Sequence, residues 1–511
     1  MRFAAEALAK HEANERIRRR EQGGGRPIVT TDTGKHRMVA VRNKVYFLPL
    51  GGTFADFLFQ YIIGVIGEEW ANAELQKTYA ERHTLMQWSE DVSHYRRSTG
   101  NGGGGVVSAE MNGVTAAYLG LAHALYRLDH NVALQDRLVH HLKTPDLFQG
   151  AYYECMVASV LIEADFELEL EDETDGSEKH CEFSARSRAS GKKYWVEAKM
   201  RGVRGVMGKG HAEGGKDGDD PTARLVRHVS RALKKPARDE RIIFVDLNAA
   251  LPPDIRPDNR PTYLDAALSK LRMYERSNME PGTKAYIFMT SSSFHRDLHG
   301  PARMFTYMYG LGIPDFNNTG PLGLAERYRQ EKPHRDALQI GKALSTFLRV
   351  PTTFDGSMAS ETFGGRVRPI IGEEYTFTQP PSQPFKGVLI AARVDEEEKK
   401  MILNVVTAAG ERVVIRNDMN EDQMRDYRQH REDFFGGHTS QPARLRAVED
   451  VFDWAMKANA ATPRHTLIQA MQGHPRMPEI SGMSDEDVRA EHAEWITRIW
   501  VTRMQSEKKT L

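Results

Sequence analysis

A lysine and two glutamates lie on two neighbouring predicted strands, with a spacing that brings their charged groups together. Glu197 and Lys199 are two residues apart in the β-type run 194–199, so a strand places both side chains on one face. The segment Ser190-Gly191-Lys192 predicts a hairpin turn. That turn places Glu182, on the preceding strand, roughly across from Glu197. We therefore expect two carboxylates and an ammonium group to converge.

The charges of this set determine the chemistry available to it. Two carboxylates within a few ångströms repel each other, and one of them tends to stay protonated. A hard divalent cation removes that conflict, and Mg²⁺ commonly takes one or two carboxylates together with a substrate phosphate. The metal polarises a phosphoryl oxygen and lowers the pKa of a bound water, while an adjacent ammonium group stabilises developing charge. Glu182, Glu197 and Lys199 thus form a minimal set for phosphodiester hydrolysis with Mg²⁺ or Mn²⁺.

A second interpretation of the same residues is an ordinary strand face exposed to solvent, with ion pairs between the strands. The neighbours of Glu197 argue against it, because Val196 and Ala198 are apolar and point toward a core. Trp195 shares the charged face and would shield the edge of a site. The pattern therefore favours a site over a solvated face.

The elements that position these residues alternate between helix and strand after residue 145. The sequence predicts, in order, a helix over 148–163, strands over 166–170, 180–185 and 194–199, a helix over 222–235, a buried strand over 242–245, a helix over 263–279 and a buried strand over 285–289. This order predicts a mixed sheet with helices on its faces, which is an α/β domain.

Four features of this segment are similar to those of a known enzyme superfamily. They are the run Phe148-Gln149-Gly150-Ala151-Tyr152-Tyr153-Glu154, the run Ala164-Asp165-Phe166, the acid Glu182 and the run Tyr194-Trp195-Val196-Glu197-Ala198-Lys199. With the order of elements, they resemble the PD-(D/E)xK nuclease superfamily. The resemblance implies a restriction-endonuclease-like core and covers about residues 147–290, which is under a third of the chain.

The resemblance also implies roles for single residues. The last motif of the superfamily, an acid followed by any residue and a lysine, matches Glu197 and Lys199. Its preceding acid matches Glu182, and its frequent glutamate on the first core helix matches Glu154. These matches imply that the three glutamates hold the metal and that Lys199 positions the attacking water. The preceding acid is usually an aspartate, so Glu182 departs from the pattern and Asp165 is the alternative ligand.

Basic residues after the third strand indicate contacts with a nucleic-acid backbone. Arg224, Arg227 and Arg231 are spaced to form one stripe of the predicted helix, which would bind phosphates without reading sequence. Arg201 and Arg204 accompany the Gly-rich loop before that helix and are further candidates. An ordinary solvated helix face is the alternative interpretation of the stripe.

Composition excludes several classes of protein. The chain of 511 residues carries 70 basic and 70 acidic residues, so it has no polybasic coat, although a local groove suffices for nucleic acid. Cys155 and Cys181 are the two cysteines, which excludes a disulfide scaffold and a four-cysteine zinc site. The first residues lack the apolar stretch of a secretory signal, and the most apolar run, 54–67, is too short to span a bilayer. We therefore expect a cytoplasmic protein without a membrane partner.

The parts of the chain outside the α/β segment have different patterns. We expect a mostly helical N-terminal region over 1–146 with helical spacing over 54–83 and 106–142, a nuclease-like domain over 147–300, a mixed region with a small antiparallel β part over 301–420, and a helical region over 421–511. At roughly 150 residues per domain, the length agrees with several domains. These flanking regions would supply specificity, partner contacts or homo-oligomerisation.

The sequence as a whole predicts a Mg²⁺-dependent endonuclease or phosphodiesterase with DNA as its expected substrate. One alternative is an inactive nuclease-like module that grips nucleic acid or a partner protein. Another is an interaction scaffold with an inert sheet. Defence against foreign DNA is a role that suits a free-standing nuclease, but none of these residues indicates that role. DNA against RNA, sequence preference, endo against exo cleavage and oligomeric state stay open.

Overall fold

The computed structural model describes most of the chain in separate ranges. These are residues 27–33, 36–49, 52–99, 109–170, 182–203, 220–235, 240–252, 259–317, 322–351, 369–377 without 373, 385–429 without 408, and 448–508, with a few isolated residues between them. The chain forms two compact units. One consists of Met1–Gly312 and Gln339–Ser440, and the other of Ile313–Leu338 and Gln441–Leu511. Each unit is therefore assembled from segments that are distant in the sequence.

Six strands in the first unit form a mixed sheet with the order β4-β5-β6-β7-β8-β9. Their bounds are β4 (Phe166–Leu170), β5 (Phe183–Ser187), β6 (Lys193–Met200), β7 (Glu240–Asp246), β8 (Ala285–Ser292) and β9 (Met304–Leu311). β4, β5 and β6 pair antiparallel, β6, β7 and β8 pair parallel, and β9 returns antiparallel to β8. The mixed α/β class expected from the sequence is confirmed, and β9 adds a strand to the five that were predicted.

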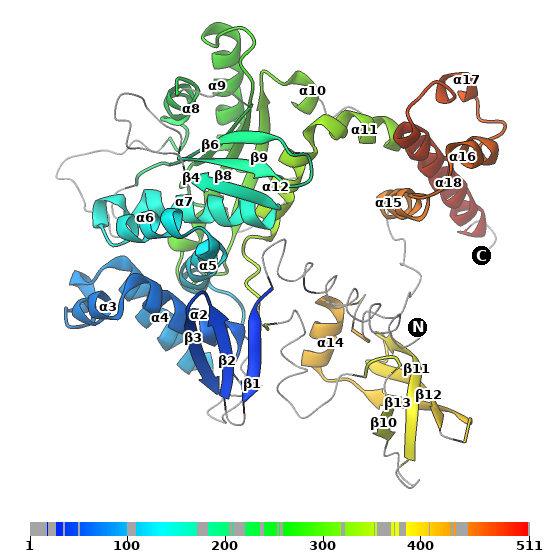
Figure 1. Ribbon diagram of the computed structural model, residues 1–511, viewed down its shortest axis with the longest axis horizontal. Helices are drawn as coiled ribbons and strands as arrows, with labels where there is room; N and C mark the ends of the chain where they lie inside the picture. Colours follow the sequence, from blue (N-terminus) through cyan, green and yellow to red (C-terminus); the bar gives the residue numbers. More distant parts are fainter. Residues whose placement is uncertain are drawn as a thin grey trace. The chain divides into compact units, whose positions relative to one another are not determined.

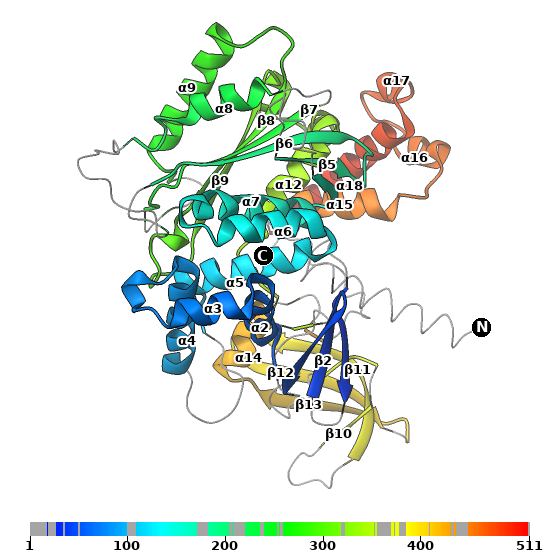
Figure 2. The same cartoon turned by 60° about the vertical axis from the view of Figure 1, so that its left-hand side comes forward.

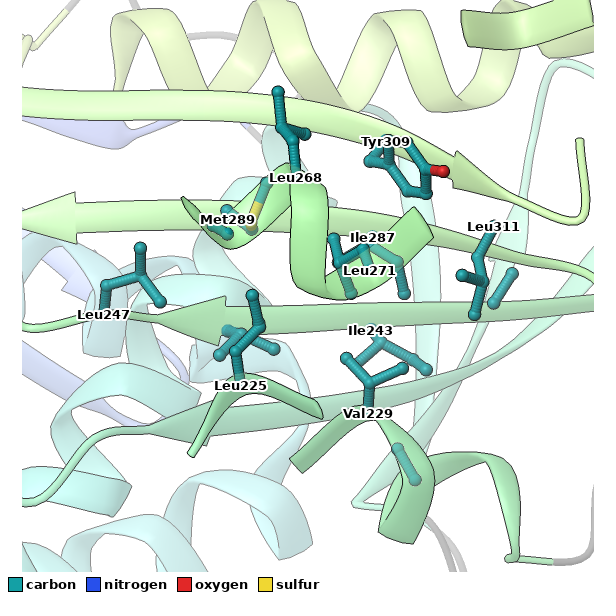
Figure 3. Packing of buried hydrophobic residues seen from close by; sticks show 14 of the residues in the cluster. Leu225, Val229, Ile243, Leu247, Leu268, Leu271, Ile287, Met289, Tyr309 and Leu311 are labelled. Carbon is teal, nitrogen blue, oxygen red and sulfur yellow. The ribbon is translucent and has the colours of Figure 1, made fainter. Parts of the chain in front are cut away.

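Helices cover both faces of this sheet (Figure 1). α7 (Pro145–Glu163) packs against β4 and β6 on one face, and α8 (Leu225–Leu233) and α9 (Tyr263–Ser277) lie on the other (Figure 2). The second face is held by a buried apolar cluster, drawn in Figure 3, whose members include Leu225, Val229, Leu268, Leu271, Ile243, Ile287 and Tyr309. Parallel strands need such crossover connections, so the sequence order α-β-β-β-α-β-α-β produces both layers.

The described residues of the N-terminal part combine a small sheet with five α-helices. β1 (Val29–Thr33), β2 (His36–Val41) and β3 (Lys44–Pro49) are antiparallel, and they precede α2 (Phe54–Ile66), α3 (Glu68–Leu75), α4 (Thr84–Thr99), α5 (Gly113–Arg127) and α6 (Val132–Leu142). Each long helical stretch expected from the sequence is broken. Gly67, with φ of 96°, separates α2 from α3, and Asn131 caps a new helix by accepting the Leu134 N–H.

A second small sheet lies in the C-terminal half of the first unit. β10 (Glu374–Phe377), β11 (Phe385–Asp395), β12 (Lys400–Thr407) and β13 (Arg412–Asp418) form an antiparallel meander. Side chains such as Leu389, Leu403 and Ile415 form its core with Met424 of α14 (Glu421–Gln429). The sequence predicted antiparallel β structure here. α12 (Arg335–Thr346) spans the boundary of the two units in sequence.

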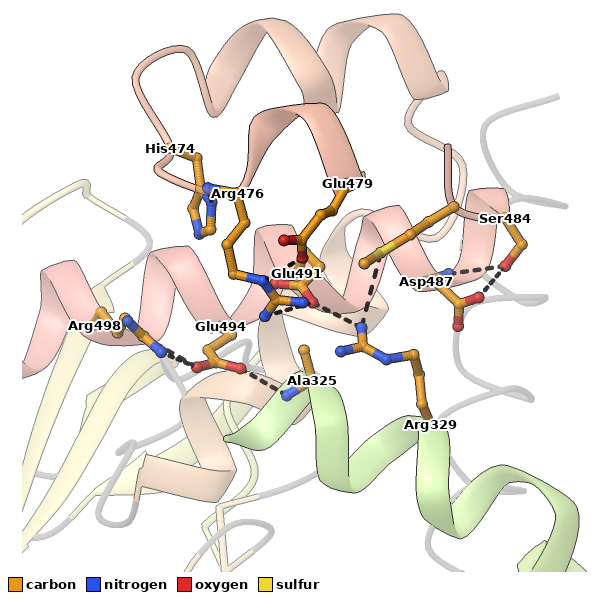
Figure 4. A network of polar contacts seen from close by, with 11 residues as sticks. Ala325, Arg329, His474, Arg476, Glu479, Ser484, Asp487, Glu491, Glu494 and Arg498 are labelled. Carbon is orange, nitrogen blue, oxygen red and sulfur yellow. Dashed lines mark hydrogen bonds and ion pairs between the residues drawn. The ribbon is translucent and has the colours of Figure 1, made fainter. Parts of the chain in front are cut away.

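The second unit is helical in the residues that the structure describes. Its helices are α10 (Pro314–Asn317), α11 (Leu324–Glu331), α15 (Val448–Ala458), α16 (Arg464–Ala470), α17 (Met477–Ile480) and α18 (Asp485–Lys508). Ion pairs join them around α18 (Figure 4). Glu491 lies 2.7 Å from Arg329 and 3.7 Å from Arg476. Throughout the described ranges of the whole chain, no helix combines the length and apolar character that crossing a membrane requires.

Candidate active site

The structure brings the predicted lysine and the two glutamates together. The Lys199 ammonium group contacts the Glu182 carboxylate and lies 2.9 Å from Glu197 Oε1. Phe183 of β5 pairs with Val196 of β6, so the next position, Glu182, falls opposite Glu197. The hairpin geometry expected from the sequence therefore places these three side chains correctly, although β5 begins at Phe183 and residues 171–181 lie outside the described part.

Glu197 is the most deeply buried member of the cluster, with 2% of the residue exposed. It pairs in register with Ile243 of β7, whose side chain packs against α8 and α9. The carboxylate thus points to the face of the sheet that these two helices cover. Its Oε2 atom is buried and accepts no hydrogen bond from any residue in the described ranges. A buried oxygen without a donor is costly, and such an atom is suited to an external ligand.

Lys235 is a member of the cluster that sequence reasoning missed. It follows α8, and its Nζ atom lies 2.6 Å from Glu197 Oε1. Two ammonium groups therefore share one carboxylate oxygen. The sequence offered only a weak signal, because the pair Lys234-Lys235 at a helix end is also what the helix dipole favours.

Glu154 joins the site from α7, as the resemblance implied. Arg137 of α6, which sequence reasoning also missed, connects it to the strands: its guanidinium lies 3.8 Å from Glu154 Oε2 and donates to the Glu182 backbone carbonyl at 3.2 Å. Burial and the nearby negative charge of Glu182 raise the pKa of Glu154 to about 8, against the opposing effect of Arg137 and Lys199. Without a divalent ion, Glu154 is therefore largely protonated at neutral pH.

The pKa shifts of Glu182 and Lys199 favour their charged forms, whereas the raised pKa of Glu154 favours its neutral form. Burial by itself raises the pKa of Glu182, but the positive charge and hydrogen bond of Lys199 outweigh it and leave that pKa below the usual value. Burial likewise lowers the pKa of Lys199, yet the adjacent carboxylates of Glu182 and Glu197 raise it well above the usual value. Lys199 is therefore a fixed positive charge and a hydrogen-bond donor in this arrangement.

The arginine stripe of α8 has the orientation expected from the sequence. Arg224, Arg227 and Arg231 are exposed, while the opposite side of the helix is buried in the cluster of Figure 3. α8 begins at Leu225 rather than at 222, so Arg224 is its N-cap. Burial and the positive charges of Lys199 and the three arginines lower the pKa of His228 to about 4. A positive field therefore extends along α8.

The remaining described candidates, Arg201 and Asp165, have other partners. The Arg201 guanidinium donates to the backbone carbonyls of Leu247 at 2.7 Å and Asn248 at 3.1 Å, and these contacts hold the loop after β7. Arg204 lies outside the described residues. Asp165 precedes β4, whose first residue pairs with the last residue of β5, which is the end of β5 remote from Glu182. The structure therefore favours Glu182 over Asp165 as the second acid.

The donor set fits a hard divalent cation in its chemistry. Glu154, Glu182 and Glu197 offer oxygen ligands only, which suits Mg²⁺ and Mn²⁺ better than soft metals. In the side-chain positions of the described residues, no three His, Cys, Asp or Glu groups are already spaced to coordinate an ion. Lys199 and Lys235 supply the positive charge beside the carboxylates instead. An ion would therefore compete with these ammonium groups for the same oxygens.

Comparison with known proteins adds no relative to this picture. No family model, no curated protein and no solved structure matches the chain. Any function must consequently be argued from the residues and their geometry.

Proposed function

We propose that the protein is a metal-dependent nuclease that hydrolyses phosphodiester bonds, with DNA as the expected substrate and Mg²⁺ or Mn²⁺ as the cofactor. The observation that carries the proposal is the buried carboxylate of Glu197, which shares Lys199 with Glu182 and keeps one oxygen without a donor among the described residues. Groups with mutually perturbed pKa values gather at functional sites more often than elsewhere. The resemblance to the PD-(D/E)xK superfamily supports the same activity.

Glu182, Glu197 and Glu154 would hold the ion. Bound there, the ion would supply a Lewis acid that polarises a phosphoryl oxygen and acidifies a water molecule. Glu154 would lose its proton more readily beside a divalent cation, because a nearby positive charge lowers the pKa of a carboxyl group. Arg137 would keep α7 and the Glu182 backbone in register, since its guanidinium reaches both.

Lys199 would act as an electrostatic catalyst. Its raised pKa keeps the ammonium group protonated, so the group donates hydrogen bonds and stabilises negative charge on the phosphate rather than removing a proton. Lys235 would offset the charge of Glu197 from the α8 side. The exposed arginines of α8, on the same face of the sheet, would hold neighbouring phosphates without reading sequence.

Cleavage of supercoiled and linear DNA with Mg²⁺ or Mn²⁺ tests this function. Wild-type protein should cut, EDTA should stop the cutting, and Glu197→Gln should abolish it. Glu167→Gln is the matched control, because its side chain is 55% exposed on β4, the edge strand two places from β6, and pairs with Arg188. A Glu197→Gln variant that cuts like the wild type would overturn the assignment.

One observation favours a second candidate, a nuclease-like module that grips nucleic acid without cutting it. Lys199 and Lys235 already surround the Glu197 carboxylate, so the folded cluster is charge-balanced without an ion. This module would bind DNA with a steep salt dependence and be indifferent to EDTA. Failure of the wild-type protein to cut any DNA or RNA form, with such binding intact, would favour it over the nuclease.

A further inference from the structure

The small sheet β10–β13 has one covered face and one open face. On the covered face, Leu389, Leu403 and Val405 are buried in a cluster with Met424 of α14, and α14 lies against the sheet (Figure 1). On the open face, Ile390 is 43% exposed and Val414 is 53% exposed. The two faces of the sheet therefore differ in solvent exposure, although Ile402, which also lies on the open face, is only 9% exposed.

Strand register sets the residues of the open face in rows. Val388, Val406 and Arg412 form one row across β11, β12 and β13. Two rows further along, Arg393 and Arg416 flank Ile402. Neighbouring strands are about 4.8 Å apart, so Arg393 and Arg416 lie about 10 Å apart at the backbone.

Positive charge on this face has no acidic partner in an ion pair within the described part of the chain. Lys386, Arg393, Arg412 and Arg416, here called the basic face, are all exposed. Among the residues that the structure describes, none forms an ion pair with these four side chains. Glu374 of β10 is the acid that shares the central rows with them. The chain is neutral overall, so this is a local surplus.

Acidic residues mark one end of the same face. Asp395, Lys400 and Asp418 form the last row, at the turn between β11 and β12, and Lys400 is paired with Glu398 at 3.1 Å. The positive surplus is thus confined to the rows before this end. A polyanion crossing the strands at Arg393, Arg412 and Arg416 would avoid the acids of this last row.

We propose that the basic face binds the phosphate backbone of nucleic acid as a second contact surface, separate from the α8 stripe. The inference rests on the proposed function in taking nucleic acid as the partner. Unpaired guanidinium groups recognise phosphate with paired hydrogen bonds. The outward side chains of the described strands include no aromatic ring for base stacking, so the contact is independent of sequence.

The proposal is tested by binding of a duplex oligonucleotide to the full-length protein. Fluorescence anisotropy measures this binding between about 50 and 200 mM salt, a range over which counterion release changes the affinity strongly. EDTA is present throughout, so the result does not depend on cleavage and a failed nuclease proposal is recognised separately. Arg393→Gln, Arg412→Gln and Arg416→Gln combined should reduce the slope of log K against log salt by about three.

A matched triple variant controls for loss of charge alone. Arg327→Gln, Lys399→Gln and Arg428→Gln remove the same charge from side chains that are 57%, 51% and 52% exposed, each paired with a carboxylate. The control variant should lose at most about one unit of the salt slope, whereas the test variant should lose about three. Equal binding by wild type and test variant would overturn the proposal. The proposal would also be overturned if the test variant bound DNA like the wild type and lost binding only to vesicles of anionic lipid.

Discussion

Glu197 in the first unit and Glu491 in the second are buried to the same degree, with side chains 2% and 3% exposed. Both lie beside two cations. Glu491 is flanked by arginines from two other helical segments, Arg329 and Arg476, and it joins elements of a helical unit (Figure 4). Glu197 is instead flanked by lysines and shares one of them with a second carboxylate.

The difference lies in what each carboxylate leaves unsatisfied. Among the described residues, no oxygen of Glu491 is buried without a hydrogen-bond partner, and its neighbour on α18, Glu494, accepts the Ala325 N–H at 2.8 Å and pairs with Arg498 of the same helix. Glu197 keeps an oxygen without a donor among the described residues, with Glu182 and Glu154 close by. A buried acid is therefore weak evidence of a site, whereas gathered acids with a spare oxygen are stronger evidence.

The largest expected effect is on catalysis at the first cluster. Lys199→Ala should lower the rate of DNA cleavage by about 10²- to 10³-fold, because it removes a preorganised positive charge at the phosphate. Circular dichroism should show an intact fold, and single-turnover cleavage gives the rate. Full activity in this variant would contradict the role given to Lys199 and erase the contrast with Glu491.

The second cluster should respond in stability instead. Arg329→Ala leaves Glu491 with one cation, and breaking a buried ion pair costs about 3 kcal/mol. Urea unfolding should show this loss in the helical unit, while the cleavage rate stays at the wild-type level. A variant with unchanged stability and reduced cleavage would reverse the distinction drawn between the two clusters.

Titration gives a third and smaller contrast. The pKa of Glu154 is raised to about 8 by burial and Glu182, so the folded state keeps a proton that the unfolded state releases above about pH 4.3. Stability attributable to this group is fully present below about pH 4.3 and is lost as pH rises from there to about 8, at up to about 1.4 kcal/mol per pH unit. Glu154→Gln should lessen this decline in urea unfolding at pH 5.5 and pH 8.

Glu486 of the second unit provides the opposite sign as a control. Hydrogen bonds from Lys332 and Tyr328 lower the pKa of Glu486 to about 2. Its contribution is present above about pH 4.3 and is lost as pH falls toward 2. Glu486→Gln should therefore leave the pH 5.5 to pH 8 difference unchanged. A flat profile for the wild-type protein, matching Glu154→Gln, would show that Glu154 is not held protonated.

The smallest expected effect concerns the helix beside the first cluster. Arg227→Gln should weaken DNA binding uniformly across sequences and reduce the salt slope by about one. The loss should be absent for Arg464→Gln, which belongs to the second unit and pairs with Asp485 at 3.1 Å. Anisotropy titrations with two unrelated duplexes check both points, and a sequence-dependent loss would contradict a pure phosphate contact.

Local rules were sufficient for the strand part of the site. The i, i+2 spacing of Glu197 and Lys199 and the turn at Gly191 place Glu182 across the hairpin, because strand side chains alternate and a short turn sets the register. The order of helices and strands gave the mixed sheet for a similar reason, since parallel strands need helical crossovers.

Tertiary packing determines the rest of the site, because local sequence patterns do not encode which distant helices and loops contact the strands. Arg137 is 45 residues from Glu182 in sequence, and its reach depends on how α6 lies against α7. Lys235 depends in the same way on where α8 ends. The contacts of Arg201 with carbonyls 46 and 47 residues away depend on the fold in the same way. The specific restriction-endonuclease-like core stays a prediction.

Divalent metal binding at Glu197 is the most direct test of the account. Isothermal titration of Mn²⁺ into the wild-type protein, Glu197→Gln and the control Glu167→Gln measures it without any substrate. The account predicts saturable binding to the wild type and the control, and its loss in Glu197→Gln. Binding that survives in Glu197→Gln, or a wild-type protein that binds no Mn²⁺, would contradict it.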